Sequence, residues 1–254
     1  NLKKKKMNIL VCISSVPDTT TKINFSENGS KFDSSGVQFV INPYDEFGLT
    51  KAIMLKEKHG GKVTAITVGE QAVEPVIRKA LAIGADEAIR VNMSPQDSYS
   101  TAVEISNYIS ENQFDLIICG KESSDYNGGV VGGIIAELVK HPFVNACNGL
   151  EISNSVANLD REIDGGKETL EIDLPLVIGG QKGLVEESEL RIPNMRGIMQ
   201  ARTKPLLVLE PKNNDLLTES INFEKPSERG DCKIISSENI SELVSLLQNE
   251  AKVI

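Results

Sequence analysis

The sequence is poor in the residues that most often perform acid–base and nucleophilic chemistry. Its 254 residues include no tryptophan and only two histidines. Histidine is the usual general base at neutral pH, so this scarcity argues against a histidine-based catalytic centre. The cysteines lie far apart with no CxxC pair, which indicates neither a zinc site nor a disulfide framework and favours a reducing compartment. The four are Cys12, Cys119, Cys147 and Cys232.

Positive charge and long apolar runs are also lacking. The 27 Lys and Arg residues are outnumbered by 36 Asp and Glu residues, which gives a formal net charge of -9. Sequence-independent nucleic-acid binding needs a clustered positive surface, so protein or small-molecule partners are favoured and nucleic acid is not. No run approaches the roughly 20 apolar residues that span a membrane. The run that follows the basic opening NLKKKK is also too short for a signal peptide. We therefore expect a native start at or near Met7, no direct membrane insertion and a cytoplasmic location.

Short apolar runs alternate with longer amphipathic segments through the first two-thirds of the chain. This rhythm predicts an α/β fold in which strands and helices alternate in a mostly parallel, Rossmann-like sheet. Hydrophobic residues make up 40% of the chain, enough for a substantial core. Strands are expected at 8–13, 62–69, 87–93 and 114–120. Helices are expected at 42–61, 74–86, 98–112 and 130–141, with Ser98 or Ser100 as the N-cap of the third.

Three segments depart from this rhythm. Residues 19–41 alternate around Asn28-Gly29, which predicts a β-hairpin inserted on one edge of the sheet. After Pro142, period-two patches surround the turn residues Asp164–Gly166 and predict antiparallel strands. From Asn213 onward the chain is polar and ends in one amphipathic helix. A segment with so little core of its own needs a surface to lie on.

The most informative loop follows the strand at 114–120 and reads KESSDYNGGVVGG. In a parallel sheet, ligands collect beyond the carboxyl ends of the strands. Gly128 and Gly129 allow close approach of the backbone, and the N–H groups of the next helix suit a phosphate. Asp125 and Asn127 offer side-chain hydrogen bonds. The loop is therefore consistent with a phosphate-bearing nucleotide, and equally with a plain turn that packs the helix closely on the sheet.

Other nucleotide signatures are absent. There is no GxxxxGK[ST] loop, and SSVPDTT follows the first strand where a dinucleotide fingerprint would stand. Nucleotide hydrolysis is therefore poorly supported. The turn at Asn42-Pro43 offers a second wall, because its backbone groups suit the edge of a purine; it also fits a simple helix N-terminus.

Two further segments have a possible contact role. Residues 190–204 intersperse apolar side chains (Leu190, Ile192, Met195, Ile198, Met199) with basic ones (Arg191, Arg196, Arg202, Lys204). Flexible methionines rimmed by arginine suit an adaptable contact surface for acidic partners, or a basic loop whose methionines lie in the core. The charged cluster at 160–164 is typical of a solvated hairpin face.

Five segments together are similar to one family, the β subunits of electron-transfer flavoproteins. In family order they are NPYDEFGLTKAIMLKE, RKALAIGADEAI, DLIICGKESSDYNGGVVGG, REIDGGKETLEIDLPLVI and RIPNMRGIMQARTKPL. They span Met7 to about Pro211, and the last is the family's signature region. The loop after residue 120 is shorter than in some relatives and carries Gly128-Gly129 where they have larger polar residues.

The resemblance implies a heterodimer in which the α subunit holds most of the FAD and the β subunit binds a structural AMP. It implies a nucleotide-binding domain at 7–211, with a partner-recognition loop at about 183–204, and an arm at 212–254 that packs on the α subunit. The residues that it assigns to the nucleotide are Cys12, Asn42, Pro43, Tyr44, Asp45, Val68, Asp125, Asn127, Gly128, Gly129 and Val130.

The same resemblance implies an electron carrier of fatty acid β-oxidation, with no catalytic or metal-binding residues of its own. Electrons would pass from acyl-CoA dehydrogenases to the shared FAD and on to a quinone oxidoreductase. The recognition loop would use Arg191, Ile192, Ile198 and Met199 around the anchor Met195, and Glu162 would hold the flavin domain of the α subunit.

Two alternatives remain at this stage. An electron-bifurcating relative would hold a second FAD in place of AMP and oxidise NADH. A nucleotide hydrolase or adenylating enzyme would carry a loop such as SGGxDS after the first strand, where residues 12–19 read CISSVPDT.

Overall fold

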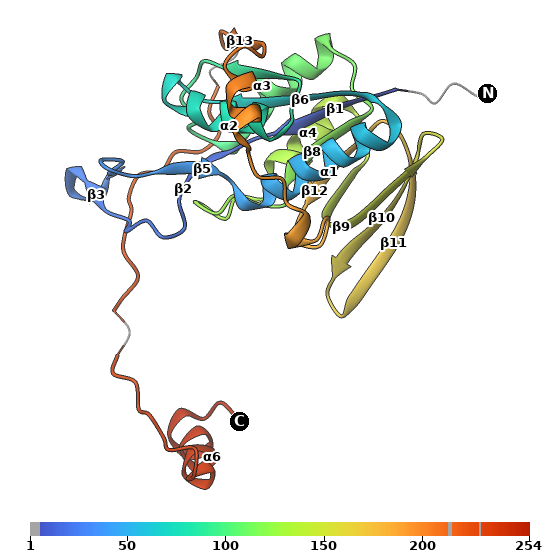
Figure 1. Ribbon diagram of the computed structural model, residues 1–254. Helices are drawn as coiled ribbons and strands as arrows, with labels where there is room; N and C mark the ends of the chain where they lie inside the picture. Colours follow the sequence, from blue (N-terminus) through green and yellow to red (C-terminus); the bar gives the residue numbers. More distant parts are fainter. Residues whose placement is uncertain (1–5, 213–214, 229) are drawn as a thin grey trace.

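A nine-stranded sheet forms the centre of the computed structural model, which describes residues 6–212, 215–228 and 230–254. The strand order is β11-β10-β9-β12-β8-β1-β6-β7-β13 (Figure 1). The predicted α/β fold with a mostly parallel sheet is confirmed. The strands are β1 (Met7–Cys12), β6 (Gly61–Val68), β7 (Glu87–Val91), β8 (Leu116–Gly120), β9 (Phe143–Ser153), β10 (Val156–Ile163), β11 (Gly166–Asp173), β12 (Leu176–Gly180) and β13 (Leu206–Leu209).

The order of strands reverses beside β1. The chain runs outward from β1 to β6 and β7 on one side, then crosses back to β8 on the other. Ile9 therefore has two parallel register partners, Val63 on β6 and Leu116 on β8. In open parallel sheets, such a switch point leaves a crevice at the carboxyl ends of the two central strands. The fold thus places its crevice between β1 and β8.

Helices cover both faces of the parallel strands. One buried cluster joins α1 and α2 to the side chains of Ile9 and Val11, and the other joins α3 and α4 to those of Leu10 and Cys12. Successive side chains of a strand point to opposite faces, which explains why neighbours in β1 belong to different clusters. The helices are α1 (Pro43–His59), α2 (Glu74–Ile83), α3 (Ser98–Glu111) and α4 (Val131–Val139).

The ends of these helices follow from their sequences, with one correction. Pro43 occupies the first turn of α1, and Gly60, at φ 75°, ends it. We expected Ser98 or Ser100 to cap α3, and this was wrong. The cap is Asp97, whose carboxylate accepts a 2.7 Å hydrogen bond from the Ser100 N–H. A carboxylate at this position also interacts favourably with the helix dipole.

The expected hairpin forms, but not on the edge of the large sheet. β3 (Phe25–Ser26) pairs with β4 (Lys31–Phe32) around Asn28, which has φ 59°. β2 (Ser15–Pro17) pairs separately with β5 (Phe39–Ile41). Within the described residues, both pairs are separate two-stranded sheets.

The antiparallel strands after residue 142 extend the main sheet, and Figure 1 shows β10 and β11 reaching beyond the helical layers. β9 joins β12 in parallel, while β10 pairs antiparallel with β9 and β11. The connection from β12 to β13 then crosses the face covered by α1 and α2 and contains α5 (Met195–Ala201). Arg191 fastens it to α1, through its N–H to Thr50 Oγ1 (3.2 Å) and through an ion pair with Glu57 (2.8 Å).

The C-terminal arm follows β13 and leaves the body of the molecule (Figure 1). Its described residues carry one short helix, α6 (Ile240–Leu246), continued by a π-helical turn at Leu247–Ala251. Among the described residues, no helix has the length and apolar character needed to cross a membrane.

Candidate functional site

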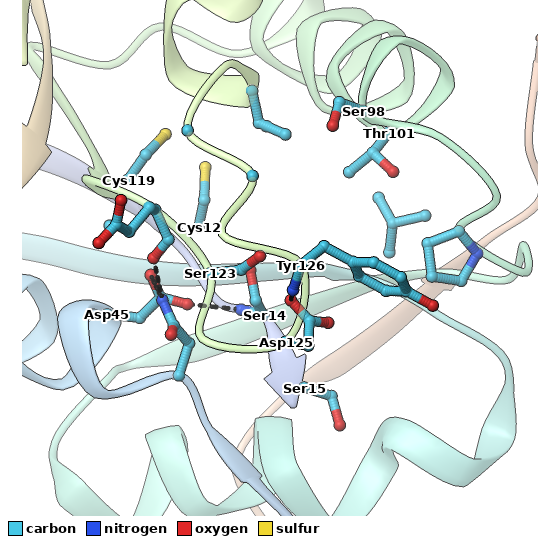
Figure 2. Close-up of a pocket in the computed structure, with 18 of the residues that line it drawn as sticks. Cys12, Ser14, Ser15, Asp45, Ser98, Thr101, Cys119, Ser123, Asp125 and Tyr126 are labelled. Atoms are coloured by element: carbon cyan, nitrogen blue, oxygen red, sulfur yellow. Dashed lines mark hydrogen bonds between the residues drawn. The ribbon is translucent and has the colours of Figure 1, made fainter. Parts of the chain in front are cut away.

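A cavity of about 410 Å³ opens at the carboxyl ends of β1, β6 and β8, at the switch point of the sheet (Figure 2). Its floor is formed by Cys12, Val68, Cys119 and Gly120, the last residues of these strands. The polar walls come from the loops that follow the strands and from the first turns of α1, α3 and α4. This volume lies at the small end of the range for ligand pockets, about 300–1,000 Å³.

A buried pair, Asn42 and Asp45, braces one side of the cavity. Asp45 accepts a 2.7 Å hydrogen bond from the Ser14 N–H and a 3.1 Å bond from the Asn42 amide. Asn42 also donates to Glu122 O at 2.9 Å and accepts from the Ser124 N–H at 3.1 Å. Although Asn42 precedes Pro43 at the position of an N-cap, its side chain makes no cap hydrogen bond. Its amide instead fixes the loop after β8.

Burial gives Asp45 an unusual protonation equilibrium. The carboxyl is 2% exposed, and this burial raises its pKa to about 7 although hydrogen bonds from Ser14, Asn42 and Gly120 oppose the rise. Desolvation disfavours the charged form, whereas N–H donors favour it. Asp45 therefore changes charge near neutral pH. In its ionised form it is a full acceptor for the N–H groups that position the cavity wall.

Gly120 leaves space for this brace. A Cβ at this position would lie 2.3 Å from Asp45 Oδ1 and 3.0 Å from Asn42 Nδ2. Contacts this close do not occur in proteins, so a side chain would displace the brace. The absence of a side chain lets α1 approach the end of β8.

The loop from Lys121 to Val130 forms a tight turn over the cavity. Ser123 N–H donates to Gly128 O at 3.1 Å, and Asn127 has the positive φ of 50° that the turn requires. α4 begins immediately afterwards, and no side chain caps its first N–H groups. Free N–H groups at a helix start, next to glycines that expose the backbone, are suited to a phosphate. The turn can therefore hold an anionic group at the mouth of the crevice.

Two cysteines lie in the floor of the cavity. Cys12 and Cys119 are free thiols with their sulfurs on the cavity side of β1 and β8 (Figure 2). Hydrogen bonding with Cys119, together with burial, raises the pKa of the Cys12 thiol well above its ordinary value. A protonated thiol is a weak nucleophile, so this one behaves as a small apolar side chain. Within the described residues, no group of three or more His, Cys, Asp or Glu side chains is placed to hold a metal ion.

The structure brings most of the predicted nucleotide-binding residues together. The wall of the cavity contains Cys12, Asn42, Asp45, Val68, Asp125, Gly128 and Gly129. Four others lie outside it: Pro43, Tyr44, Asn127 and Val130. Pro43 and Tyr44 belong to the first turn of α1 and flank the brace, while Asn127 and Val130 shape the turn around the glycines. Val130 is 54% exposed, on the solvent side of that turn.

Sequence reasoning missed two other parts of the wall. Pro95, Gln96, Asp97, Ser98 and Thr101 reach the cavity from the start of α3, and Thr218 and Ser220 reach it from the C-terminal arm. The α3 contribution was foreseeable, because the loop after β7 must emerge at the same sheet edge as the loops after β1 and β8. No periodicity in the arm indicated that it returns to the crevice.

The predicted partner-binding residues lie on other elements and do not line the cavity. Ile192 and Met195 are 82% and 74% exposed, and Ile198 and Met199 are also exposed. Glu162 lies on β10, where the Gln181 amide donates to its carboxylate at 2.7 Å. The cluster around it is a charged hairpin face, with Arg161 paired to Glu168 and Asp160 to Lys167.

Comparison with known proteins identifies the family. The family model for the electron transfer flavoprotein domain matches residues 30–214. Electron transfer flavoprotein subunit beta of Bacillus subtilis (strain 168) is 38% identical over 262 residues, covering 98% of this chain and 100% of the relative. The chain belongs to the family of electron transfer flavoprotein β subunits.

Two other relatives are less similar to this chain. The β subunit of Syntrophomonas wolfei is 31% identical over 97% of this chain and 98% of its own length. Acryloyl-CoA reductase electron transfer subunit gamma of Anaerotignum propionicum is 30% identical over 80% of this chain and 78% of its own. Membership of the electron transfer flavoprotein family implies electron transfer, association with a flavin and an α subunit as partner.

Proposed function

We propose that this chain is the nucleotide-carrying β subunit of a heterodimer, with a structural AMP in the cavity between β1 and β8. The cavity itself is the observation that carries the proposal. It lies at the switch point of the sheet and is bounded by Gly128, Gly129 and the uncapped start of α4. These N–H groups suit the phosphate of a mononucleotide. The apolar floor of Cys12 and Val68 suits a flat base.

The residues of the cavity fit an adenylate in both size and chemistry. The Asn42–Asp45 brace fixes the Ser14 and Ser124 backbone beside the space for the base, so polar edges meet ordered groups. Asp125, whose carboxylate accepts from the Tyr126 N–H at 2.7 Å, is a hydrogen-bond acceptor and suits a hydroxyl donor better than a phosphate. Asn127 and Val130 support the turn rather than contact the ligand. Binding and orientation are thus the work of this chain.

The flavin, held mainly by the α subunit, supplies the electron-carrying chemistry when bound. This chain positions the flavin domain and its donors. We place Glu162 at the contact with that domain, because the carboxylate is already oriented by Gln181 and lies at the exposed end of β10. The arm, domain 212–254 of our proposal, packs on the α subunit through exposed apolar residues that a free chain leaves in water. They include Ile234, Ile240 and Leu243.

Docking of acyl-CoA dehydrogenases is assigned to residues 183–204 of the domain at 7–211. Met195 is the anchor, surrounded by Ile192, Ile198 and Met199. Arg191 is tied to α1 through Thr50 and Glu57, so the base of the loop is rigid while its apolar tip is exposed. Burying a side chain of this size in an interface contributes about 1.5–3 kcal/mol to the free energy of binding. A quinone oxidoreductase then accepts the electrons, in a cytoplasmic carrier of fatty acid β-oxidation.

The test is the composition of the purified complex. The chain is purified with its untagged partner, and the ligands are extracted and quantified by absorbance and chromatography. We expect one AMP and one FAD per heterodimer. A complex with no adenine nucleotide beyond the one FAD would overturn the AMP assignment.

The docking role is tested separately. Met195→Ala should slow electron acceptance from an acyl-CoA dehydrogenase at least about tenfold, from the lost burial, with AMP content unchanged. Leu138→Ala is the matched control, because Leu138 is an exposed apolar residue of α4 outside the loop. Equal kinetics for both variants would remove Met195 from this role.

A second candidate places a second FAD in the same cavity, with NADH as the donor in an electron-bifurcating complex. The similarity to a relative named as an electron transfer subunit of acryloyl-CoA reductase favours it, because that name assigns the relative to a reductase. Two flavins per heterodimer and no AMP would establish it.

A further inference from the structure

Residues 216–223 of the arm, here named the strap, run beside the cavity. Thr218 and Ser220 of the strap contribute to the cavity wall. Figure 2 shows other parts of this cavity, Ser98 and Thr101 of α3 and the loop that carries Tyr126. The strap lies about 100 residues later in the chain than these groups. Its position beside them is therefore determined by long-range contacts.

Asp97 anchors the first half of the strap. Its Oδ2 accepts hydrogen bonds from the backbone N–H groups of Leu217 (2.8 Å) and Thr218 (3.1 Å), while its Oδ1 caps α3 through Ser100. Partial burial alone would raise the pKa of Asp97, but the bonds from Ser100, Leu217 and Thr218 hold it at about 2. The carboxylate is therefore ionised at neutral pH, and its hydrogen bonds are of the stronger, charge-assisted kind.

Phe223 anchors the second half. Its ring stacks on Phe25 with centroids 5.4 Å apart and lies 6.4 Å from the Tyr126 ring. Its N–H donates to Gly29 O at 2.7 Å. The strap is thus held at one end by the cap of α3, and at the other by the β3–β4 hairpin and the phosphate-side loop.

The strap lies beside the turn proposed for the phosphate. A Cβ on Gly128 would lie 3.9 Å from Ser98 Oγ, and Ser98 is adjacent to Asp97. A group that extends beyond the phosphate of a bound adenylate must therefore pass the strap anchor. AMP ends at that phosphate, whereas the flavin half of FAD continues from it.

We infer that the strap is a specificity element, which closes over a mononucleotide and excludes a dinucleotide as long as Asp97 and Phe223 hold it in place. The inference rests on the proposed function, because it requires the cavity to bind an adenylate. It assigns the choice between AMP and FAD to contacts outside the predicted binding residues. It also links the cavity to the arm, which continues from the strap to α6.

The experiment compares the full-length chain with two variants that release opposite ends of the strap. Asp97→Asn keeps a good N-cap for α3 but replaces the anionic acceptor with an amide. Phe223→Ala removes the ring stack without changing the core. Asp33→Asn is the matched control, because Asp33 makes a similar local bond to the Ser35 N–H with no contact to the strap. Circular dichroism verifies the fold of each variant.

AMP and FAD affinities are measured by titration calorimetry, and AMP release by rapid filtration. We expect wild type and Asp33→Asn to prefer AMP, and both strap variants to release AMP about tenfold faster. We expect their preference to shift toward FAD by about tenfold, or about 1.4 kcal/mol. Unchanged release and preference in both strap variants, with normal AMP binding, would overturn the strap's role but not the AMP assignment. A shift in Asp97→Asn alone would also overturn it, since the effect would then belong to α3. A wild-type chain that binds neither nucleotide overturns the proposed function, and the strap inference with it.

Discussion

Replacement of Asp45 by asparagine should change how the stability of the ligand-free protein depends on pH. The wild-type carboxyl is buried, and its pKa is raised from 3.8 to about 7. Because the folded-state pKa is higher than the unfolded one, the folded state binds the proton more tightly. Asp45 thus contributes stability that is fully present below about pH 4, decreases as the pH rises and is lost above about pH 7. Asp45→Asn has no such proton to lose.

The size of the effect follows from the two pKa values. A difference of about three pH units corresponds to about 4 kcal/mol, at 1.36 kcal/mol per unit. Over the accessible range from pH 5 to pH 8, the wild type should lose about 2–3 kcal/mol of unfolding free energy relative to the variant. Asparagine has nearly the same shape but presents an amide where Asp45 accepts from the Asn42 amide at 3.1 Å. A constant cost at every pH is therefore added to the pH-dependent change.

Urea unfolding of both proteins at half-unit steps from pH 5 to pH 8 measures this difference. The quantity of interest is the free energy of unfolding of wild type minus that of Asp45→Asn, because the titration of other groups cancels. It should fall with rising pH and become flat above about pH 7. A difference that stays constant, or that rises with pH, would refute the assignment of a raised pKa to Asp45.

Three other substitutions test the packing around the cavity and α2. Gly120→Ala should lower the free energy of unfolding by about 1–3 kcal/mol or more and weaken AMP binding, because the new Cβ would lie 2.3 Å from Asp45 Oδ1. Thermal unfolding and AMP titration measure the two effects. A variant with unchanged stability and binding would contradict the observed brace. Asn42→Ala should lower the free energy of urea unfolding by about 2–4 kcal/mol, because Glu122 O and the Ser124 N–H lose their partner. Asn112→Ala is the control and should lower it by about 1 kcal/mol, because it loses only a 2.9 Å bond to Tyr108 O. Lys204→Met should lower the free energy of unfolding by about 1–3 kcal/mol and speed amide hydrogen exchange at the end of α2, because Nζ donates to Leu81 O (2.9 Å) and Ala85 O (2.6 Å). Amide protection equal to that of wild type would show that these bonds are dispensable.

Local sequence patterns predicted the main strands and helices well, because the apolar runs and the helix-end signals coincide with the observed elements. Apolar runs such as Leu116–Cys119 are buried on both faces, and Pro43 and Gly60 mark the ends of α1 as expected. Failures occurred where one side chain had competing uses. Asp97, rather than a nearby serine, caps α3 because its second oxygen also binds the arm.

The cavity was only partly predictable for a related reason. Residues on loops that follow adjacent parallel strands must meet at one edge, so the glycine turn could be placed at the crevice from the sequence. Cys12 and Val68 were added by the family resemblance. The role of Asn42 as a tie to Glu122 and Ser124, 80 and 82 residues away, has no local signal. The same holds for Thr218 and Ser220, because the arm is polar and lacks periodicity. Long-range contacts of single polar groups leave no repeating pattern in a sequence.

The connection from β12 to β13 has a mechanical consequence. Its two ends belong to strands on opposite sides of β1, so the segment bridges both halves of the sheet. Its middle is attached to α1 by the hydrogen bond and the ion pair of Arg191. In the proposed docking role, a protein that binds at the exposed Met195 therefore contacts a segment secured at three points rather than a free loop. In the docking role proposed above, an electron donor bound there would keep a fixed position relative to the cavity.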